Sequence, residues 1–127
     1  LSIQLPILWV AGAGGIWLFY VQHQFRGVYW ARREQWDRLR AAVYGSSLYL
    51  LPEALRWLSG SIGFHFIHHL GPRIPNYHLK RCYDEVPELR AKEPLSVRES
   101  LASPRLKLWD EERGELVGFP AGKWRAA

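Results

Sequence analysis

The feature that most restricts the fold is a long stretch without charge at the start of the chain. Residues Leu1 to Gln22 contain no Asp, Glu, Lys or Arg. As an α-helix this stretch would be about 33 Å long, close to the roughly 30 Å hydrocarbon thickness of a bilayer. A secretory signal peptide would need a charged start and a cleavage site after a shorter apolar core, and neither is present. The stretch predicts a transmembrane helix over 1–22, with a buried helix of a soluble protein as the alternative.

Positive charge follows this stretch directly. Only Glu34 and Asp37 oppose five arginines between residues 26 and 40, namely Arg26, Arg32, Arg33, Arg38 and Arg40. Positive residues beside a span mark its cytoplasmic side, so we expect residues 23–120 in the cytoplasm. Seven Trp and six Tyr also suit a chain at a membrane interface. The formal charge of +5 would suit nucleic acid too, but its position beside the apolar stretch favours a membrane and no nucleic-acid partner.

Two residue types add to this interpretation. Cys82 is the single cysteine, so an intramolecular disulfide cannot form and a reducing, cytosol-facing setting is favoured. We expect Cys82 to be buried and without a catalytic role. The chain has no Met and opens inside the apolar stretch, which indicates a fragment of a longer protein.

Helical spacing continues beyond the span. Between Ala31 and Tyr44 the pattern is amphipathic, with Glu34 and Arg38 spaced for an i,i+4 pair. This predicts a helix that lies either against its own domain or in the membrane interface. The apolar face of this helix would consist of Trp36, Leu39 and Val43, and a second helical pattern follows in Leu51, Leu55, Leu58 and Ile62.

Breaks and caps define the remaining elements. Gly60 and Gly63 allow a bend, and Pro72 and Pro75 end the helix that follows it. Asn76 is predicted to cap a helix that runs to about Glu85, and Ser96 and Glu99 are predicted to form a capping box. A hairpin is predicted over 106–119 around Glu112-Arg113-Gly114, followed by a loose tail over 121–127. The predicted fold is therefore mainly α: a fragment of an integral-membrane helical protein with one transmembrane helix, a cytoplasmic helical region and a small C-terminal β-hairpin.

A histidine cluster is the main candidate for chemistry. His65, His68 and His69 form an H-x-x-H-H pattern, and residues spaced i, i+3 and i+4 share one helix face. The neighbouring residues are apolar, and burying several imidazoles among them is costly unless each finds a partner. Imidazole suits iron, zinc and copper, so the pattern indicates a metal site, although three polar surface residues would give the same spacing.

His23 is the second informative histidine, because it lies where the apolar stretch ends. It is either a ligand from a separate element or an interfacial residue that contacts lipid headgroups. Other sites find no support, since there is no H-E-x-x-H motif and no cysteine pair. The glycines between Gly12 and Gly15 lie inside the span, which argues against a dinucleotide-binding loop.

Several segments resemble bacterial acyl-lipid fatty-acid desaturases of the omega-6 or delta-12 type. The resemblance covers about Gly14 to Phe119 and is strongest around the histidine cluster. The segments that carry it are Trp17-Leu18-Phe19-Tyr20-Val21-Gln22-His23-Gln24-Phe25, Gly45-Ser46-Ser47 through Leu51-Pro52, Leu55-Arg56-Trp57-Leu58, Ile62-Gly63-Phe64-His65-Phe66-Ile67-His68-His69-Leu70 and Arg73-Ile74-Pro75-Asn76-Tyr77.

The resemblance implies an activity and a cofactor. It implies a cis double bond made in an acyl chain with O2, two non-haem irons, and an external donor such as ferredoxin or cytochrome b5. The substrate would be an acyl lipid or an acyl carrier. The implied ligands are His23, His65, His68 and His69. The two earlier histidine clusters of the family are absent, so the isolated fragment is expected to be inactive.

The chain departs from the family pattern at one position, and two other functions are alternatives to a desaturase. Relatives often carry histidine near Tyr83, a position outside the ligand clusters. His78 follows the helix end beside Lys80 and Arg81, where nearby cations disfavour a metal, so we expect it not to bind. A related membrane di-iron hydroxylase or ketolase is an alternative, although the Pro-Asn-Tyr stretch favours a desaturase. A non-catalytic membrane domain is the other alternative.

Overall fold

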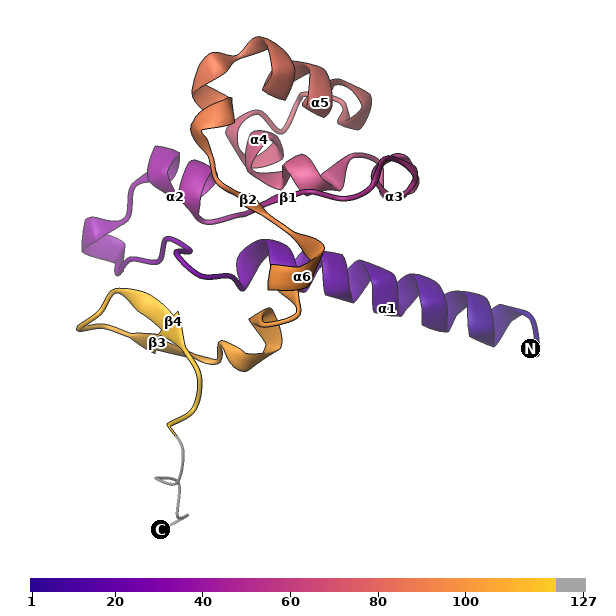
Figure 1. Ribbon diagram of the computed structural model, residues 1–127, viewed down its shortest axis with the longest axis horizontal. Coiled ribbons are helices and arrows are strands. Elements are labelled where there is room, and N and C mark those ends of the chain that lie inside the picture. Colours follow the sequence, from indigo (N-terminus) through magenta and orange to yellow (C-terminus); the bar gives the residue numbers. More distant parts are fainter. Residues whose placement is uncertain (121–127) are drawn as a thin grey trace.

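The computed structural model describes residues 1–120, and the predicted tail over 121–127 lies outside them. The chain is mainly helical with short strands, which confirms the predicted fold class. The first helix, α1 (Gln4–His23), extends away from all other elements, with the N-terminus at its free end (Figure 1). The other elements gather around its C-terminal end.

Helix α1 has the length and composition to cross a membrane. Its apolar side chains point in all directions, and Trp9 and Ile16 are 76% and 72% exposed. A helix that is apolar all round needs an apolar environment on every side, which lipid provides and water does not. Only Val21 and Gln22 of this helix are buried, at the end where it enters the rest of the chain.

The hydrophobic core lies beyond α1 and is small. It consists of Leu48 on β1 (Leu48–Tyr49), Leu79 on α5 (Asn76–Glu85), Phe66 and Ile67 on α4 (His65–Leu70), and Phe64 just before α4. Strand β1 pairs in parallel with β2 (Pro94–Leu95), which brings a late part of the sequence beside the middle of the chain. The backbone N–H of Ser47 donates to the carbonyl of Gln22 at 2.8 Å, so the core is tied to the end of α1.

The helix predicted over Ala31–Tyr44 is wrong as a single element. The structure has a 3-10 helix, η1 (Arg33–Gln35), and a separate helix, α2 (Arg38–Tyr44). Trp36 and Asp37 between them are extended, because the Asp37 carboxylate accepts a hydrogen bond from the Arg40 N–H and thereby caps α2. Glu34 and Arg38 lie on different elements, so the predicted i,i+4 geometry does not arise.

The second helical pattern gives a shorter helix than its leucines suggest. Helix α3 (Glu53–Leu58) ends before a turn in which Gly60 has a φ of +61°. The predicted bend at Gly60 is therefore confirmed, because a positive φ favours glycine. Gly63, in the 3-10 helix η2 (Ile62–Phe64), has a different role: a Cβ there would lie 2.2 Å from the Tyr49 carbonyl oxygen.

The C-terminal elements largely follow the predictions. Helix α5 begins at Asn76, but its cap position is Pro75, so the prediction that Asn76 caps it is wrong. The predicted capping box of Ser96 and Glu99 is present and opens α6 (Val97–Ser100). The remaining elements are the 3-10 helices η3 (Pro87–Ala91) and η4 (Ser103–Arg105) and the strands β3 (Leu108–Asp110) and β4 (Glu115–Val117).

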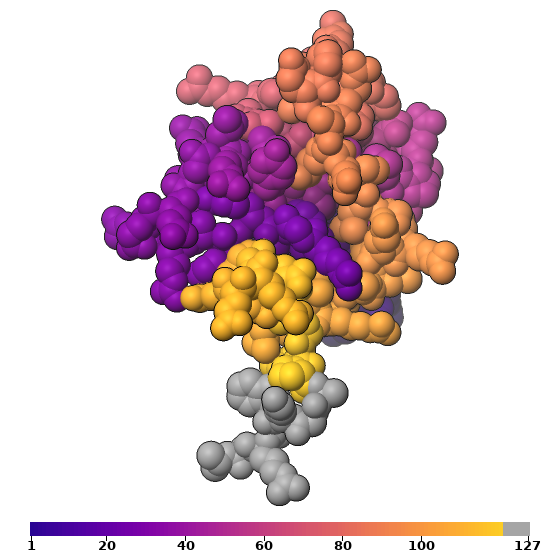
Figure 2. All heavy atoms as spheres, turned by 60° about the vertical axis from the view of Figure 1, so that its left-hand side comes forward, coloured from indigo at the N-terminus to yellow at the C-terminus, as the bar shows by residue number. Residues whose placement is uncertain are grey.

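Strands β3 and β4 form the predicted antiparallel hairpin. Gly114 has a φ of +63° in its turn, where the Asp110 carboxylate accepts from two backbone N–H groups. The hairpin lies on the surface next to the segment that follows α1 (Figure 2). Trp109 meets Trp30 with ring centroids 5.4 Å apart, so the hairpin packs against the segment between α1 and η1.

Candidate metal centre

His23 is the last residue of α1, and backbone groups of other segments fix its position. The neighbouring Gln22 is buried and donates from Nε2 to the Ile62 carbonyl at 3.1 Å. The His23 Nδ1 atom lies 3.2 Å from the Gly45 carbonyl oxygen. Since a carbonyl can only accept, Nδ1 carries the proton, and Nε2 of His23 is left with its lone pair.

His65 and His69 are spaced i,i+4 on α4, so they project from the same face. The opposite face holds Phe66 and Ile67, which are buried in the core and fix the rotation of the helix. The His65 Nε2 atom lies 3.1 Å from Nε2 of His23 and 3.1 Å from Nε2 of His69. A helix end and a separate short helix thus meet at three imidazoles.

The spacing of these nitrogens fits a metal ion. One nitrogen from each of His23, His65 and His69 lies within 4.8 Å of the other two. Imidazole ligands about 2.1 Å from a common ion are separated by roughly 3.0–3.4 Å, depending on the angle between them. Hydrogen bonds alone satisfy the arrangement poorly, because a single N–H on His65 Nε2 can be directed at only one of its two neighbours. A cation attracts all three lone pairs, so the donor set fits a metal.

The protonation of the cluster also suits metal binding. Burial, followed by the charges of His69, His23 and His68, lowers the pKa of His65 to about 4. Burial, followed by the charges of His23 and His68, also lowers the pKa of His69. Both rings are therefore neutral at pH 7, and only a neutral imidazole has a lone pair for a metal. Within residues 1–120, Nδ1 of His65 is a buried nitrogen without a hydrogen-bond partner.

The structure does not bring all the predicted ligands together. The ring of His68 stacks on His65 with centroids 5.7 Å apart, but His68 lies outside the group of three converging nitrogens. Its role as a ligand stays a prediction. His78 is exposed on α5 and contacts Tyr77, with ring centroids 4.6 Å apart. His78 is not one of the three histidines whose nitrogens converge, and its failure to bind a metal stays a prediction.

The groups that position the histidines are not predicted by the sequence patterns described above. The Gly45 carbonyl is a backbone atom, and no sequence pattern marks it. Gln22 carried a usable signal, because a polar amide directly before a candidate ligand, at the end of an apolar stretch, needs a partner when buried. Lys92 was also missed: it is half-buried, and burial lowers its pKa to about 8.

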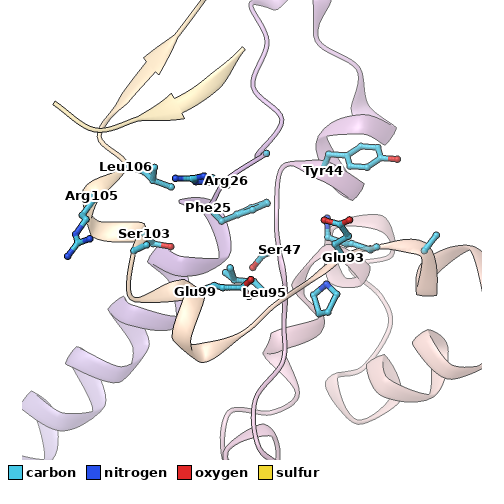
Figure 3. A pocket seen from close by; sticks show the side chains of 15 residues that line it. Phe25, Arg26, Tyr44, Ser47, Glu93, Leu95, Glu99, Ser103, Arg105 and Leu106 are labelled. Carbon is cyan, nitrogen blue, oxygen red and sulfur yellow. The ribbon is translucent and has the colours of Figure 1, made fainter. Parts of the chain in front are cut away.

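A cavity of about 720 Å³ lies beside the segments that carry the site. It is lined by parts of the chain that are far apart in sequence, including Phe25 and Arg26 after α1 and Glu93 and Leu95 near β2 (Figure 3). Phe25 borders this space from the segment after α1, and Tyr44 and Ser47 border it from the segment between α2 and β1 (Figure 3). Lys92 belongs to the same lining.

The chain is thus mainly helical, with one helix long and apolar enough to cross a bilayer and a candidate metal centre of three histidines at the end of that helix. The family model for fatty acid desaturases matches residues 2–100, and the chain belongs to this family. A "Fatty acid desaturase" of Bacillus subtilis (strain 168) is 43% identical over 123 residues. The match covers 97% of this chain and 35% of that protein, so the chain spans about a third of its relative's length. No solved structure matches the chain.

Proposed function

We propose that the protein containing this chain is an O2-dependent desaturase that introduces a cis double bond into an acyl chain at a centre of two non-haem irons. The observation that carries the proposal is the convergence of His23, His65 and His69 in a chain of the desaturase family. When bound, iron supplies the activation of O2 that is needed to remove two hydrogens from an unactivated acyl CH₂–CH₂ unit. The acyl chain gives up two electrons and two protons, an external donor supplies two more electrons, solvent supplies two more protons, and O2 is reduced to two water molecules.

The residues of this chain would hold the metal and exclude competing protons. His23, His65 and His69 would bind through the nitrogens that converge, and His68 would complete the contribution of α4. The Gly45 carbonyl keeps the proton of His23 on Nδ1, so that Nε2 remains available. Burial keeps His65 neutral, so protons compete weakly for its lone pair. The remaining ligands would come from parts of the protein outside this chain.

The proposed position of α1 in the membrane also determines how the substrate would reach the metal centre. Helix α1 would cross the bilayer, and the arginines from Arg26 to Arg40 would hold its C-terminal end at the cytoplasmic face. His23 would then lie where lipid meets cytoplasm, so an acyl lipid or an acyl carrier could present its chain from the membrane side. The donor, such as ferredoxin or cytochrome b5, would approach from the cytoplasm.

Product analysis tests the proposal. The full-length protein, expressed in a host that lacks the activity, should yield lipids with acyl chains two mass units lighter, detected by mass spectrometry. Chains sixteen mass units heavier would instead indicate a hydroxylase. Purified protein that contains no iron and leaves the lipids unchanged would contradict both activities and favour a non-catalytic membrane domain.

A further inference from the structure

Lys92 makes an unusual set of contacts. It lies between η3 and β2, and its Nζ donates a 2.6 Å hydrogen bond to the Val43 carbonyl. The same Nζ lies 5.3 Å from the ring centroid of Phe66, 5.5 Å from that of Tyr44 and 5.9 Å from that of Phe25. Ammonium groups within about 6 Å of an aromatic centroid are attracted by the ring. One side chain therefore joins three segments that are distant in sequence.

These three segments are the ones that build the histidine cluster. Phe25 follows the end of α1, Tyr44 ends α2, and Phe66 is on α4. Each residue that Lys92 contacts is within two positions of a histidine of the cluster or of the Gly45 carbonyl that bonds to it. Phe25 is two residues after His23, and Phe66 directly follows His65. Val43 and Tyr44 directly precede Gly45, whose carbonyl lies at His23 Nδ1.

The surroundings of Lys92 offset part of the cost of burying its charge. Burial lowers its pKa to about 8, so the ammonium remains mostly protonated at pH 7. No acidic side chain among residues 1–120 forms an ion pair with it. Its partners are a carbonyl and three ring faces, which offer partial negative charge without a carboxylate. An apolar side chain of equal length would leave the Val43 carbonyl without this donor and would lose the attraction to the rings.

We propose that Lys92 is a positioning residue for the metal centre: it locks the segment after α1, the end of α2 and helix α4 into the arrangement that brings His23 and His65 together. The inference rests on the proposed metal-binding function and assigns a role to a residue that is not itself a ligand. Outer groups that orient ligands typically change metal affinity by about 10- to 100-fold. Removal of the ammonium should therefore weaken metal binding and alter the geometry of the bound ion.

The test measures metal binding rather than turnover. Full-length apoprotein in detergent is titrated with Co²⁺ alone, and the dissociation constant and visible absorption spectrum of the bound ion are recorded. Lys92→Met should weaken binding about tenfold or more and shift the spectrum, whereas Lys92→Arg should restore much of the affinity. Lys80→Met is the matched control, because Lys80 pairs with Asp84 on the surface of α5 and should leave both readouts unchanged.

The outcomes separate the two proposals. If the wild-type protein binds no Co²⁺, the metal-binding function itself is wrong. If wild type binds and folded Lys92→Met matches it in affinity and spectrum, only the role of Lys92 is overturned. If Lys92→Met fails to fold, the same Co²⁺ titration of Lys92→Gln tests the role of Lys92, because glutamine keeps a hydrogen-bond donor for the Val43 carbonyl but not the charge. Weaker binding with a shifted spectrum in Lys92→Gln supports the role, and a wild-type constant and spectrum overturn it.

Discussion

At the scale of single residues, the positions of the protons decide which imidazole nitrogens of the candidate metal centre are free to bind an ion. The hydrogen bond between His23 Nδ1 and the Gly45 carbonyl fixes one tautomer, and burial keeps His65 neutral. The first effect leaves a lone pair on His23 Nε2, which lies 3.1 Å from His65 Nε2, and the second leaves His65 with one lone pair that a metal could use. The identity of the residues alone would give neither the tautomer nor the low pKa.

The first prediction compares two histidines in the full-length protein. His23→Ala should remove a converging nitrogen and lower the iron content per protein at least about tenfold at limiting iron, with loss of turnover. His78→Ala should leave the iron content near that of wild type, because His78 is exposed and contacts only its neighbour Tyr77 among the ring contacts described. Iron is measured by elemental analysis of purified protein. Equal iron content in the two variants would contradict the ligand assignment.

The second prediction concerns pH. His65 has a pKa of about 4 in the folded chain, below the ordinary value of 6.5. Between these values the unfolded chain binds a proton that the folded chain does not, so stability is full above pH 6.5 and decreases as the pH falls toward 4. The Tm of the metal-free protein should drop over this window, and the drop should be smaller in His65→Gln. The exposed His78→Gln serves as control and should keep the wild-type profile; an unchanged profile in His65→Gln would refute the assignment.

At the scale of elements, short helices position the residues of the candidate site, and the stability of each helix depends on the contacts at its ends. Helix α4 has only six residues and is held by its buried face rather than by its length, because isolated short helices are unstable in water. Helix α2 has seven residues, none of them fully buried; it begins at the Asp37 cap, and its C-terminal end provides the Gly45 carbonyl. The caps of such helices therefore affect the geometry of the centre.

The third prediction tests the cap of α2. Asp37→Ala removes the hydrogen bond to the Arg40 N–H and should lower the free energy of unfolding by about 1 kcal/mol. Asp84→Ala breaks an exposed ion pair with Lys80 on α5 and should cost less than about 0.5 kcal/mol. Chemical denaturation of the full-length protein in detergent measures both. A larger cost for Asp84→Ala than for Asp37→Ala would show that the cap is not important for α2.

At the scale of the whole molecule, the C-terminal hairpin packs against the segment that joins α1 to α2. Gln24 donates to the Leu106 carbonyl, and Arg32 forms a 2.6 Å ion pair with Glu111. The ring pair of Trp30 and Trp109 is the most apolar of these contacts. The hairpin thereby covers the chain just after His23.

The fourth prediction concerns how much each of these contacts contributes to holding the hairpin in place. Trp109→Ala should free the hairpin and raise the rate of tryptic cleavage after Arg113 about fivefold, because an aromatic pair contributes about 1 kcal/mol beyond its buried area. Glu111→Ala removes only an exposed ion pair and should change the rate less than about twofold. Cleavage is followed by mass spectrometry under native conditions. Equal rates in the two variants would mean that the ring contact does not hold the hairpin.

The fifth prediction concerns the membrane. Helix α1 has apolar side chains exposed on all sides, so the full-length protein should sediment with membranes, resist an alkaline carbonate wash and dissolve only in detergent. Western blotting of the fractions measures this. Protein in the supernatant without detergent would contradict the span.

The sequence by itself determined the elements whose causes are local. An uncharged stretch of sufficient length predicted α1, the Ser96 and Glu99 pair predicted the start of α6, and Glu112-Arg113-Gly114 predicted the hairpin turn. The resemblance to desaturases was visible in short motifs, and the family match confirms it. In each case the signal lies within a few neighbouring residues.

Tertiary structure alone decided how these elements meet. Amphipathic spacing predicted one helix over 31–44, which the local capping bond of Asp37 divides, but only folding places α2 against α4. Helical spacing placed three histidines on one face, whereas packing of Phe66 and Ile67 turns His65 and His69 toward His23 and leaves His68 aside. The distance from His23 to His65 depends on contacts between residues about forty positions apart, such as Gln22 with Ile62. Such contacts form only when the chain folds, since side-chain periodicity describes each element separately and carries no information about its neighbours in space.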